Sequence, residues 1–150
     1  MSKKHSYSFT GYGDHVSVER LMKNKALLAE LHNTSCTKKE AIGILKDLSR
    51  NYFGDEDFLV IKWDDKKQYT YGGYDIKNNQ RVFFVELGTI SQKKARSLKL
   101  KVFGLRIGIV LHEFAHVLDV YNRGDSSHGR IFVKTFTQVI NYYKTKTKSE

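Results

Sequence analysis

The sequence predicts an α+β fold in a single domain: N-terminal helices, then a small antiparallel sheet of three strands, then two further helices. In the outer thirds of the chain, apolar residues recur at helical spacing. The middle third contains short runs rich in Val, Phe and Tyr between polar turns, which is typical of strands. A length of 150 residues suits one domain with a sizeable core. We assign residues 1–150 to this domain and expect residues 1–14 and 145–150 to be flexible.

Two amphipathic helices are expected before the sheet. The apolar positions predict the first over residues 16–31 and the second over residues 37–52. Thr37 is the expected N-cap of the second helix, because Glu40 follows it at the spacing of a capping box. Gly54 comes directly after the apolar stripe, so it is the expected C-terminal cap.

The middle third predicts three strands joined by two short turns. The strands cover residues 58–63, 68–74 and 81–87, and the turns cover residues 64–67 and 77–79. Short connections predict an antiparallel meander, in which residues 81–87 are a candidate edge strand for holding an extended substrate. Gly72 and Gly73 indicate a bulge or a close approach of another backbone. The aromatic residues are more typical of core and cross-strand pairs than of a stacking platform for nucleic-acid bases.

A basic run separates the sheet from the next helix. The chain has 26 Lys and Arg against 16 Asp and Glu, a formal net charge of +10. Such an excess favours polyanions, of which nucleic acid is the commonest in a cell. The alternative is a solvated lysine-rich surface, because net charge bears on non-specific binding and not on fold. Residues 88–111 contain no acidic residue, and they supply the candidate nucleic-acid-binding residues Lys93, Lys94, Arg96, Lys99 and Lys101.

The strongest chemical signal is the HExxH motif at residues 112–116. The motif lies in a predicted helix that we expect to begin between residues 98 and 105 and to be capped by Gly124. His112 and His116 are four residues apart and therefore face the same way. Two imidazoles beside a carboxylate form the core of a zinc hydrolase site. Bound zinc would make water acidic enough to attack a carbonyl near neutral pH, and Glu113 would take its proton.

Catalytic zinc usually takes three protein ligands, so the motif needs one more. His128 is the leading candidate, because it follows a loop that can fold back toward the helix and it opens a last amphipathic helix. Asp125, a hard oxygen ligand from the same loop, is the alternative. Asp119 shares the helix face of His112, and this position favours a role in orienting a ligand imidazole over a role as a metal ligand.

A residue that stabilises the developing oxyanion is also required. The sequence leaves three candidates open for this role: Tyr121, Arg130 and Tyr142. The remaining histidines all lie in the N-terminal part and are expected at the surface: His5, His15 and His32.

Cysteine content and hydropathy limit the setting in which the chain works. Cys36 is the single cysteine, so an internal disulfide and a CxxC zinc motif are excluded. No stretch approaches the eighteen apolar residues of a membrane span. The first residues are polar and are followed by no apolar signal segment. We therefore expect an intracellular protein, cytoplasmic or in the nucleoid or nucleus, with no membrane partner.

Residues 109–132 resemble the SprT-like (Spartan) metalloprotease domain. The resemblance rests on the HExxH helix, the loop after it, and the pattern HGxxF at residues 128–132. It implies a minimal zincin fold with one Zn2+ ion bound by His112, His116 and His128, and with Glu113 as the catalytic base. It also implies proteolysis of proteins that are bound or crosslinked to DNA.

These observations predict a zinc-dependent metallopeptidase that hydrolyses protein substrates, including DNA-associated proteins. The first alternative is a nucleic-acid-binding protein whose zinc site is structural and is closed by a fourth protein ligand such as Asp125. The second is a metal-dependent hydrolase of another bond, such as a phosphodiester. Amide chemistry is favoured over the second alternative, because phosphodiester enzymes commonly use two metals and more carboxylates.

Overall fold

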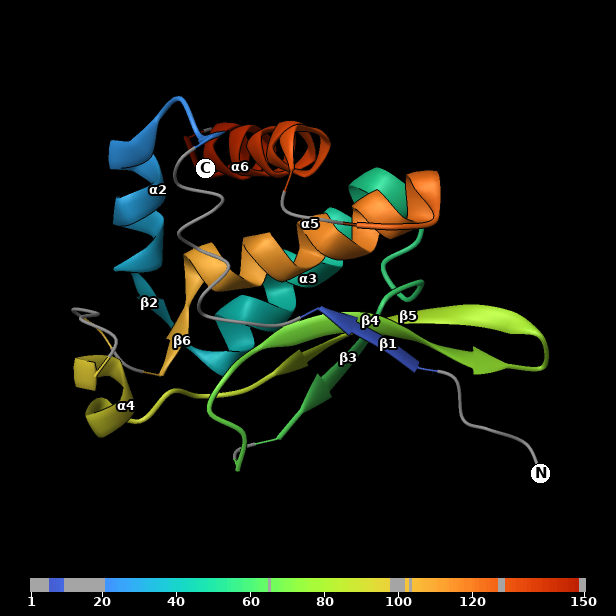
Figure 1. The fold of residues 1–150 in the computed structure, drawn as a ribbon, viewed down its shortest axis with the longest axis horizontal. Helices are drawn as coiled ribbons and strands as arrows, with labels where there is room; N and C mark the ends of the chain where they lie inside the picture. Colours follow the sequence, from blue (N-terminus) through green and yellow to red (C-terminus); the bar gives the residue numbers. More distant parts are fainter. Residues whose placement is uncertain are drawn as a thin grey trace.

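The computed structural model describes residues 6–9, 21–64, 66–97, 102, 104–126 and 129–148. In these ranges the chain has the predicted α+β class, with the longer helices gathered on one side of a four-stranded sheet (Figure 1). The helix that carries the HExxH motif, α5 (Ile107–Arg123), lies in the middle and packs against the sheet and the other long helices. None of the described helices is long and apolar enough to cross a membrane.

The two helices before the sheet follow local capping signals. Helix α2 is Lys25–His32, and the side chain of its N-cap Asn24 accepts a hydrogen bond of 3.0 Å from the Leu27 N–H. The prediction of one helix over residues 16–31 is wrong at residues 22–24, where the helix is interrupted, and residues 16–20 lie outside the described part. Helix α3 is Lys38–Phe53 and has both the predicted capping box at Thr37 and the left-handed cap at Gly54.

The sheet has the order β1-β4-β5-β3. Its strands are β1 (Ser6–Phe9), β4 (Tyr71–Lys77), β5 (Gln80–Leu87) and β3 (Val60–Trp63). Asn78 and Asn79 adopt φ of 51° and 63°, which permits the tight antiparallel β4–β5 hairpin. Strand β3 pairs with the other side of β5 and runs parallel to it.

Three expectations about the sheet are therefore wrong. The meander is a mixed sheet, because the connection over residues 64–70 is long enough to bring β4 past β5. Strand β1 lies within the N-terminal segment that we expected to be flexible, and it pairs with β4. Strand β5 has a neighbour on each side, so residues 81–87 are not an edge.

The aromatic residues of the sheet form cross-strand pairs, as predicted. Tyr74 and Phe83 are opposite each other in the β4–β5 register, with ring centroids 5.8 Å apart. On the other face the Tyr71 ring meets Phe84 edge-on at 5.9 Å, and the Lys62 ammonium lies 4.0 Å from the centre of the Phe84 ring. Phe84 is 4% exposed, so its ring is not available as a platform for a nucleic-acid base.

The helix with the motif begins later than predicted. Leu105 and Arg106 form a short strand, β6 (Leu105–Arg106), which pairs with β2 (Ser35–Cys36), and this pairing holds the chain extended until Ile107. The basic run before it contains a short helix, α4 (Gln92–Ser97), that we did not predict. Helix α6 (Arg130–Lys148) continues into the segment that we expected to be flexible after residue 144.

The core is built around α5, and every residue from Ile107 to Val120 in this helix is buried. Phe114 packs against Tyr52 and Phe53 of α3, with both ring centroids 5.8 Å away. A helix in this position is apolar on most sides, so its few polar residues are enclosed with their partners. His112, Glu113, His116 and Asp119 are such residues, each with an exposure of 2% or less.

Candidate metal centre

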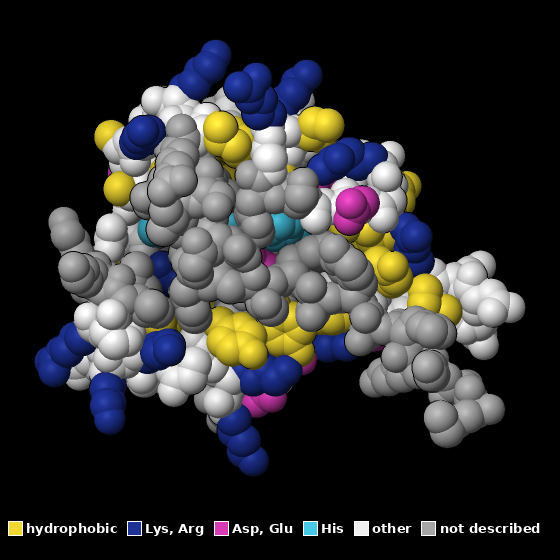
Figure 2. All heavy atoms as spheres, viewed as in Figure 1, with side chains coloured by type: hydrophobic (Ala, Val, Ile, Leu, Met, Phe, Trp, Pro, Cys, Tyr) yellow, Lys and Arg dark blue, Asp and Glu magenta, His cyan; other side chains and the backbone are white. Residues whose placement is uncertain are grey.

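His112 and His116 converge because α5 places them one helical turn apart. Their Nε2 atoms are 3.2 Å apart, and their ring centroids are 4.9 Å apart. The two side chains therefore direct a nitrogen each toward one point, in a setting from which water is largely excluded. Figure 2 shows histidine side chains near the middle of this face, with Lys and Arg projecting from its outline.

Glu113 is held beside the two imidazoles by a strand of the sheet. Its Oε1 accepts a hydrogen bond of 3.0 Å from the Gly72 N–H of β4, and its Oε2 lies 3.8 Å from His112 Nε2. The absence of a side chain at Gly72 permits this contact, because an added Cβ would lie 3.0 Å from the Glu113 carbonyl oxygen and 3.1 Å from Val117 Cγ2. The close backbone approach predicted at this glycine is confirmed.

A chain of hydrogen bonds continues behind His116. The Nδ1 of His116 lies 2.7 Å from the Ser126 hydroxyl oxygen, and this hydroxyl donates to Asp119 Oδ2 at 2.8 Å. Arg123 donates to both oxygens of Asp119, at 2.5 and 2.8 Å. These hydrogen bonds raise the pKa of the Arg123 guanidinium. Asp119 is therefore linked to His116 through the Ser126 hydroxyl.

Two phenylalanines of α6 cover the imidazoles. The Phe132 ring stacks on His116 with centroids 4.1 Å apart and an interplanar angle of 21°. Phe136 meets His112 edge-on at 5.2 Å. Packing on one side and hydrogen bonding on the other restrict both imidazoles to a few orientations.

The donor atoms fit a divalent metal ion. Within the described ranges, the possible ligand atoms of His112, Glu113 and His116 all lie within 4.8 Å of one another, and this buried group can hold a metal ion. Two imidazole nitrogens that share one tetrahedral zinc ion at about 2.0–2.1 Å lie about 3.3–3.4 Å apart. The observed separation of 3.2 Å between the Nε2 atoms is close to that value. Without metal, the same contact is an imidazole–imidazole hydrogen bond.

The third ligand stays a prediction. His128 lies outside the described residues, as do His5 and His15. Asp125 is exposed and does not belong to the group of ligand atoms found in the described part of the chain. Of the sequence-predicted ligands, the structure thus brings together the two histidines of the motif.

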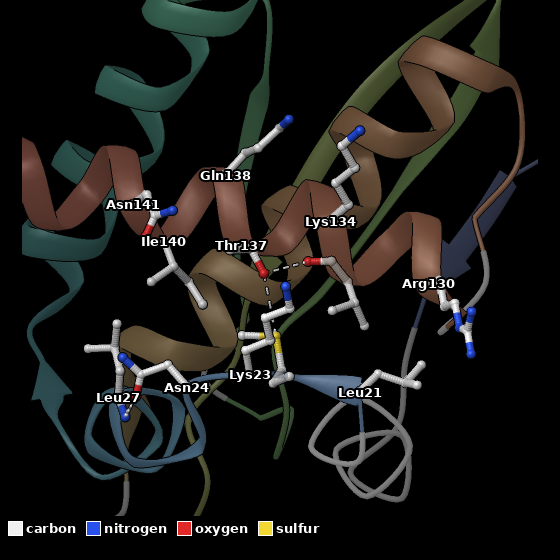
Figure 3. A pocket seen from close by; sticks show the side chains of 12 residues that line it. Leu21, Lys23, Asn24, Leu27, Arg130, Lys134, Thr137, Gln138, Ile140 and Asn141 are labelled. Atoms are coloured by element: carbon white, nitrogen blue, oxygen red, sulfur yellow. Dashed lines mark hydrogen bonds between the residues drawn. The ribbon is translucent and has the colours of Figure 1, made fainter.

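The candidates for oxyanion stabilisation are dispersed. The Tyr121 ring packs in an aromatic cluster with Phe53, Phe58 and Phe83, with its nearest centroid at 4.8 Å. Tyr142 lies against Tyr52 of α3 at 5.9 Å. Arg130 lies at one end of a groove of about 710 Å³ between α6 and residues 21–27 (Figure 3).

His32 is not the surface residue that we expected. It is 5% exposed and lies against Gly108, where an added Cβ would be 2.5 Å from His32 Nδ1. The lack of a side chain at Gly108 makes the room in which this histidine is buried. A buried histidine therefore exists outside the metal group.

The described candidates for nucleic-acid binding in the basic run are exposed. Lys93, Lys94 and Arg96 project from α4, whereas Lys99 and Lys101 lie outside the described residues. Helix α4 lies beyond the β2–β6 pair, at the end of the molecule opposite the β4–β5 hairpin (Figure 1). The three cations are accessible to an anionic partner there.

Sequence reasoning missed two hydrogen-bonding partners of the site that lie outside the motif, Ser126 and the Gly72 N–H. Ser126 has no distinguishing local signal, because Ser127 follows it in the same loop. At Gly72 the sequence indicated a close backbone approach, but it did not show that the Gly72 N–H binds the Glu113 carboxylate.

Comparisons with protein-family models, with curated proteins and with solved structures each found no match.

Proposed function

We propose that the protein is a zinc-dependent metallopeptidase in which His112 and His116 bind the ion and Glu113 is the base. The observation that carries this proposal is the buried pair of Nε2 atoms 3.2 Å apart with a carboxylate oxygen 3.8 Å from one of them. The resemblance of residues 109–132 to SprT-like domains supports the peptidase reaction and adds His128 as the third ligand.

Each residue of the group has a distinct task in this proposal. A bound zinc ion supplies Lewis acidity to a water molecule and to the scissile carbonyl. Glu113 accepts the proton of the attacking water and passes it to the leaving amine. The Gly72 N–H holds Glu113 Oε1, so that Oε2 is the oxygen that exchanges the proton. Phe132 and Phe136 exclude water from the buried sides of the two imidazoles.

The test of this function is the substitution Glu113→Gln. The amide keeps the size of the side chain but cannot accept the proton, so cleavage of an unfolded protein substrate should fall by about 10²–10⁴-fold. Zinc content, measured by mass spectrometry of the dialysed protein, should stay near one ion per chain. Glu30→Gln, at an exposed position of α2, is the matched control and should cut like the parent. Full activity of Glu113→Gln would contradict the proposed mechanism.

We also propose that the substrates include DNA-associated proteins, with DNA held by the basic residues of α4. The three exposed cations of this helix favour this partner. If they neutralise phosphates, the logarithm of DNA affinity should fall linearly with the logarithm of salt concentration, with a slope of about −0.9 per neutralised phosphate.

The salt slope can be assigned to α4 with a triple variant. Replacing Lys93, Lys94 and Arg96 by Gln should reduce the slope by about 1 for each phosphate that the variant no longer neutralises. Lys77→Gln, at the β4–β5 hairpin, is the control and should leave the slope unchanged. A flat salt response of the parent would remove DNA from the partners. DNA binding without proteolysis, in a protein whose zinc is closed by four protein ligands, would support the structural-zinc alternative.

A further inference from the structure

We propose that Ser126 is the positioning residue that fixes the tautomer of His116 and thereby makes this imidazole a metal ligand. The inference rests on the proposed function only in naming the metal, because the tautomer is a property of the metal-free protein. Ser126 is half-buried in the loop between α5 and α6, at the point where the hydrogen-bond chain passes from His116 to Asp119.

The assignment of protons follows from a count of donors. Asp119 accepts two hydrogen bonds from Arg123, whose guanidinium stays protonated, so its carboxylate acts as an acceptor. A serine hydroxyl has one proton, and the proton of Ser126 goes to Asp119 Oδ2. The 2.7 Å contact with His116 can then be a hydrogen bond only if His116 Nδ1 donates to the Ser126 oxygen.

This direction decides what the other nitrogen of His116 can do. In a neutral imidazole, one nitrogen carries the proton and the other carries the lone pair. With the proton on Nδ1, the lone pair of His116 is on Nε2, the atom that faces His112 at 3.2 Å. The loop hydroxyl thus prepares the ligand atom before any metal arrives. Stacking of Phe132 on the ring adds a barrier to flipping it.

The Ser126 hydroxyl joins His116 to a carboxylate that is itself fixed. His116 and Asp119 both lie on α5, three apart, and the carboxylate of Asp119 is already held by Arg123 one turn further along. The Ser126 hydroxyl bridges the two side chains from a different segment of the chain. It therefore also ties the loop after α5, which carries the predicted ligand His128, to the helix that carries the motif.

The first test measures the tautomer without metal or substrate. Long-range nitrogen–proton correlation spectra of the metal-free protein distinguish a protonated ring nitrogen from one with a lone pair. We expect His116 to be protonated at Nδ1 and unprotonated at Nε2. A His116 that carries its proton on Nε2 would overturn the inference, whether or not the protein is a peptidase.

The second test compares two variants at the same position. Ser126→Ala removes the acceptor and should weaken zinc affinity by about 10–100-fold, which is typical when a group that orients a metal ligand is removed. Ser126→Thr keeps the hydroxyl and should stay within a few-fold of the parent. Affinity is measured by competition with a fluorescent zinc chelator, and Ser97→Ala on α4 is the control.

The outcomes separate this inference from the proposed function. If Ser126→Ala binds zinc as tightly as the parent and keeps the same tautomer, the inference is wrong even though the peptidase proposal stands. If the parent binds zinc and cuts no protein, the tautomer and the affinity ratio still decide the role of Ser126. If the parent binds no zinc, the claim that Ser126 makes His116 a metal ligand is wrong, and the spectrum of the metal-free protein decides only whether Ser126 fixes the tautomer.

Discussion

The protein buries histidines in two regions that differ in what surrounds them. His112 and His116 direct nitrogens toward each other at 3.2 Å, and each is positioned by phenylalanine rings of another helix. His32 is also buried, but it fills the space beside Gly108 and belongs to no group of converging ligand atoms within the described residues. Burial of a histidine therefore does not identify a metal site, whereas donor atoms that converge on one point do.

The strongest contrast is expected between one histidine from each region. His116→Ala removes a proposed ligand and its anchor to Ser126, so bound zinc should fall from about one ion per chain to a trace after dialysis. His32→Ala should lose stability through the cavity that it leaves, by about 2–4 kcal/mol, yet keep its zinc when folded. Mass spectrometry of both variants, with circular dichroism as a check on folding, measures this contrast. Zinc that is absent from His32→Ala and kept by His116→Ala would reverse it.

The next largest effects are expected from substitutions of Gly108, which lies against His32, and of Gly72, which lies against Glu113. Gly108→Ala places a methyl 2.8 Å from the His32 backbone nitrogen, and we expect a net loss of about 1–3 kcal/mol from overpacking. Gly72→Ala meets its neighbours at 3.0–3.1 Å, so its loss of stability should be smaller. Its effect on cleavage should be larger, because β4 must move away and take its N–H from Glu113. Urea unfolding and initial rates of both variants sharpen the comparison, and equal rates would contradict it.

A weaker effect is expected at Cys36, which is partly buried and belongs to no group of converging ligand atoms within the described residues. Burial raises the pKa of the Cys36 thiol from 9.0 to about 11, with the Glu40 charge adding to the shift. The unfolded chain loses its thiol proton first, so the contribution of Cys36 to stability is present below pH 9 and is lost as the pH rises toward 11. Alkylation by iodoacetamide should be slow at about pH 8 and should accelerate through this window. Rapid modification at the lower pH would show that Cys36 is not protected in this way.

Local signals made part of the fold predictable from the sequence. The capping box at Thr37 and the cap at Gly54 involve residues close together in the chain, so their spacing is sufficient. The parallel pairing of β3 with β5 depends on which strand edge is left open after the hairpin forms. The start of α5 depends on a pairing with Ser35 and Cys36, which are far earlier in the chain. No local pattern contains that information.

The candidate site divides in the same way. His112, Glu113 and His116 could be predicted because one helical turn brings them together. The position of Tyr121 could have been judged better, because five residues after His116 a helix has turned about 140° away. Ser126 could not be distinguished from Ser127, since the choice depends on how the loop returns to Asp119. Close packing at Gly108 could be expected from its missing side chain, but its partner His32 could not, because that contact joins separate helices.

The proposed zinc centre is best tested by a high-resolution crystal structure of the zinc-loaded protein, with the ion located by anomalous scattering. We expect one anomalous peak between the Nε2 atoms of His112 and His116, a third bond from His128, and a fourth position that holds no protein atom. A peak surrounded by four protein ligands, or His128 turned away with no ion between the two histidines, would contradict the proposed centre.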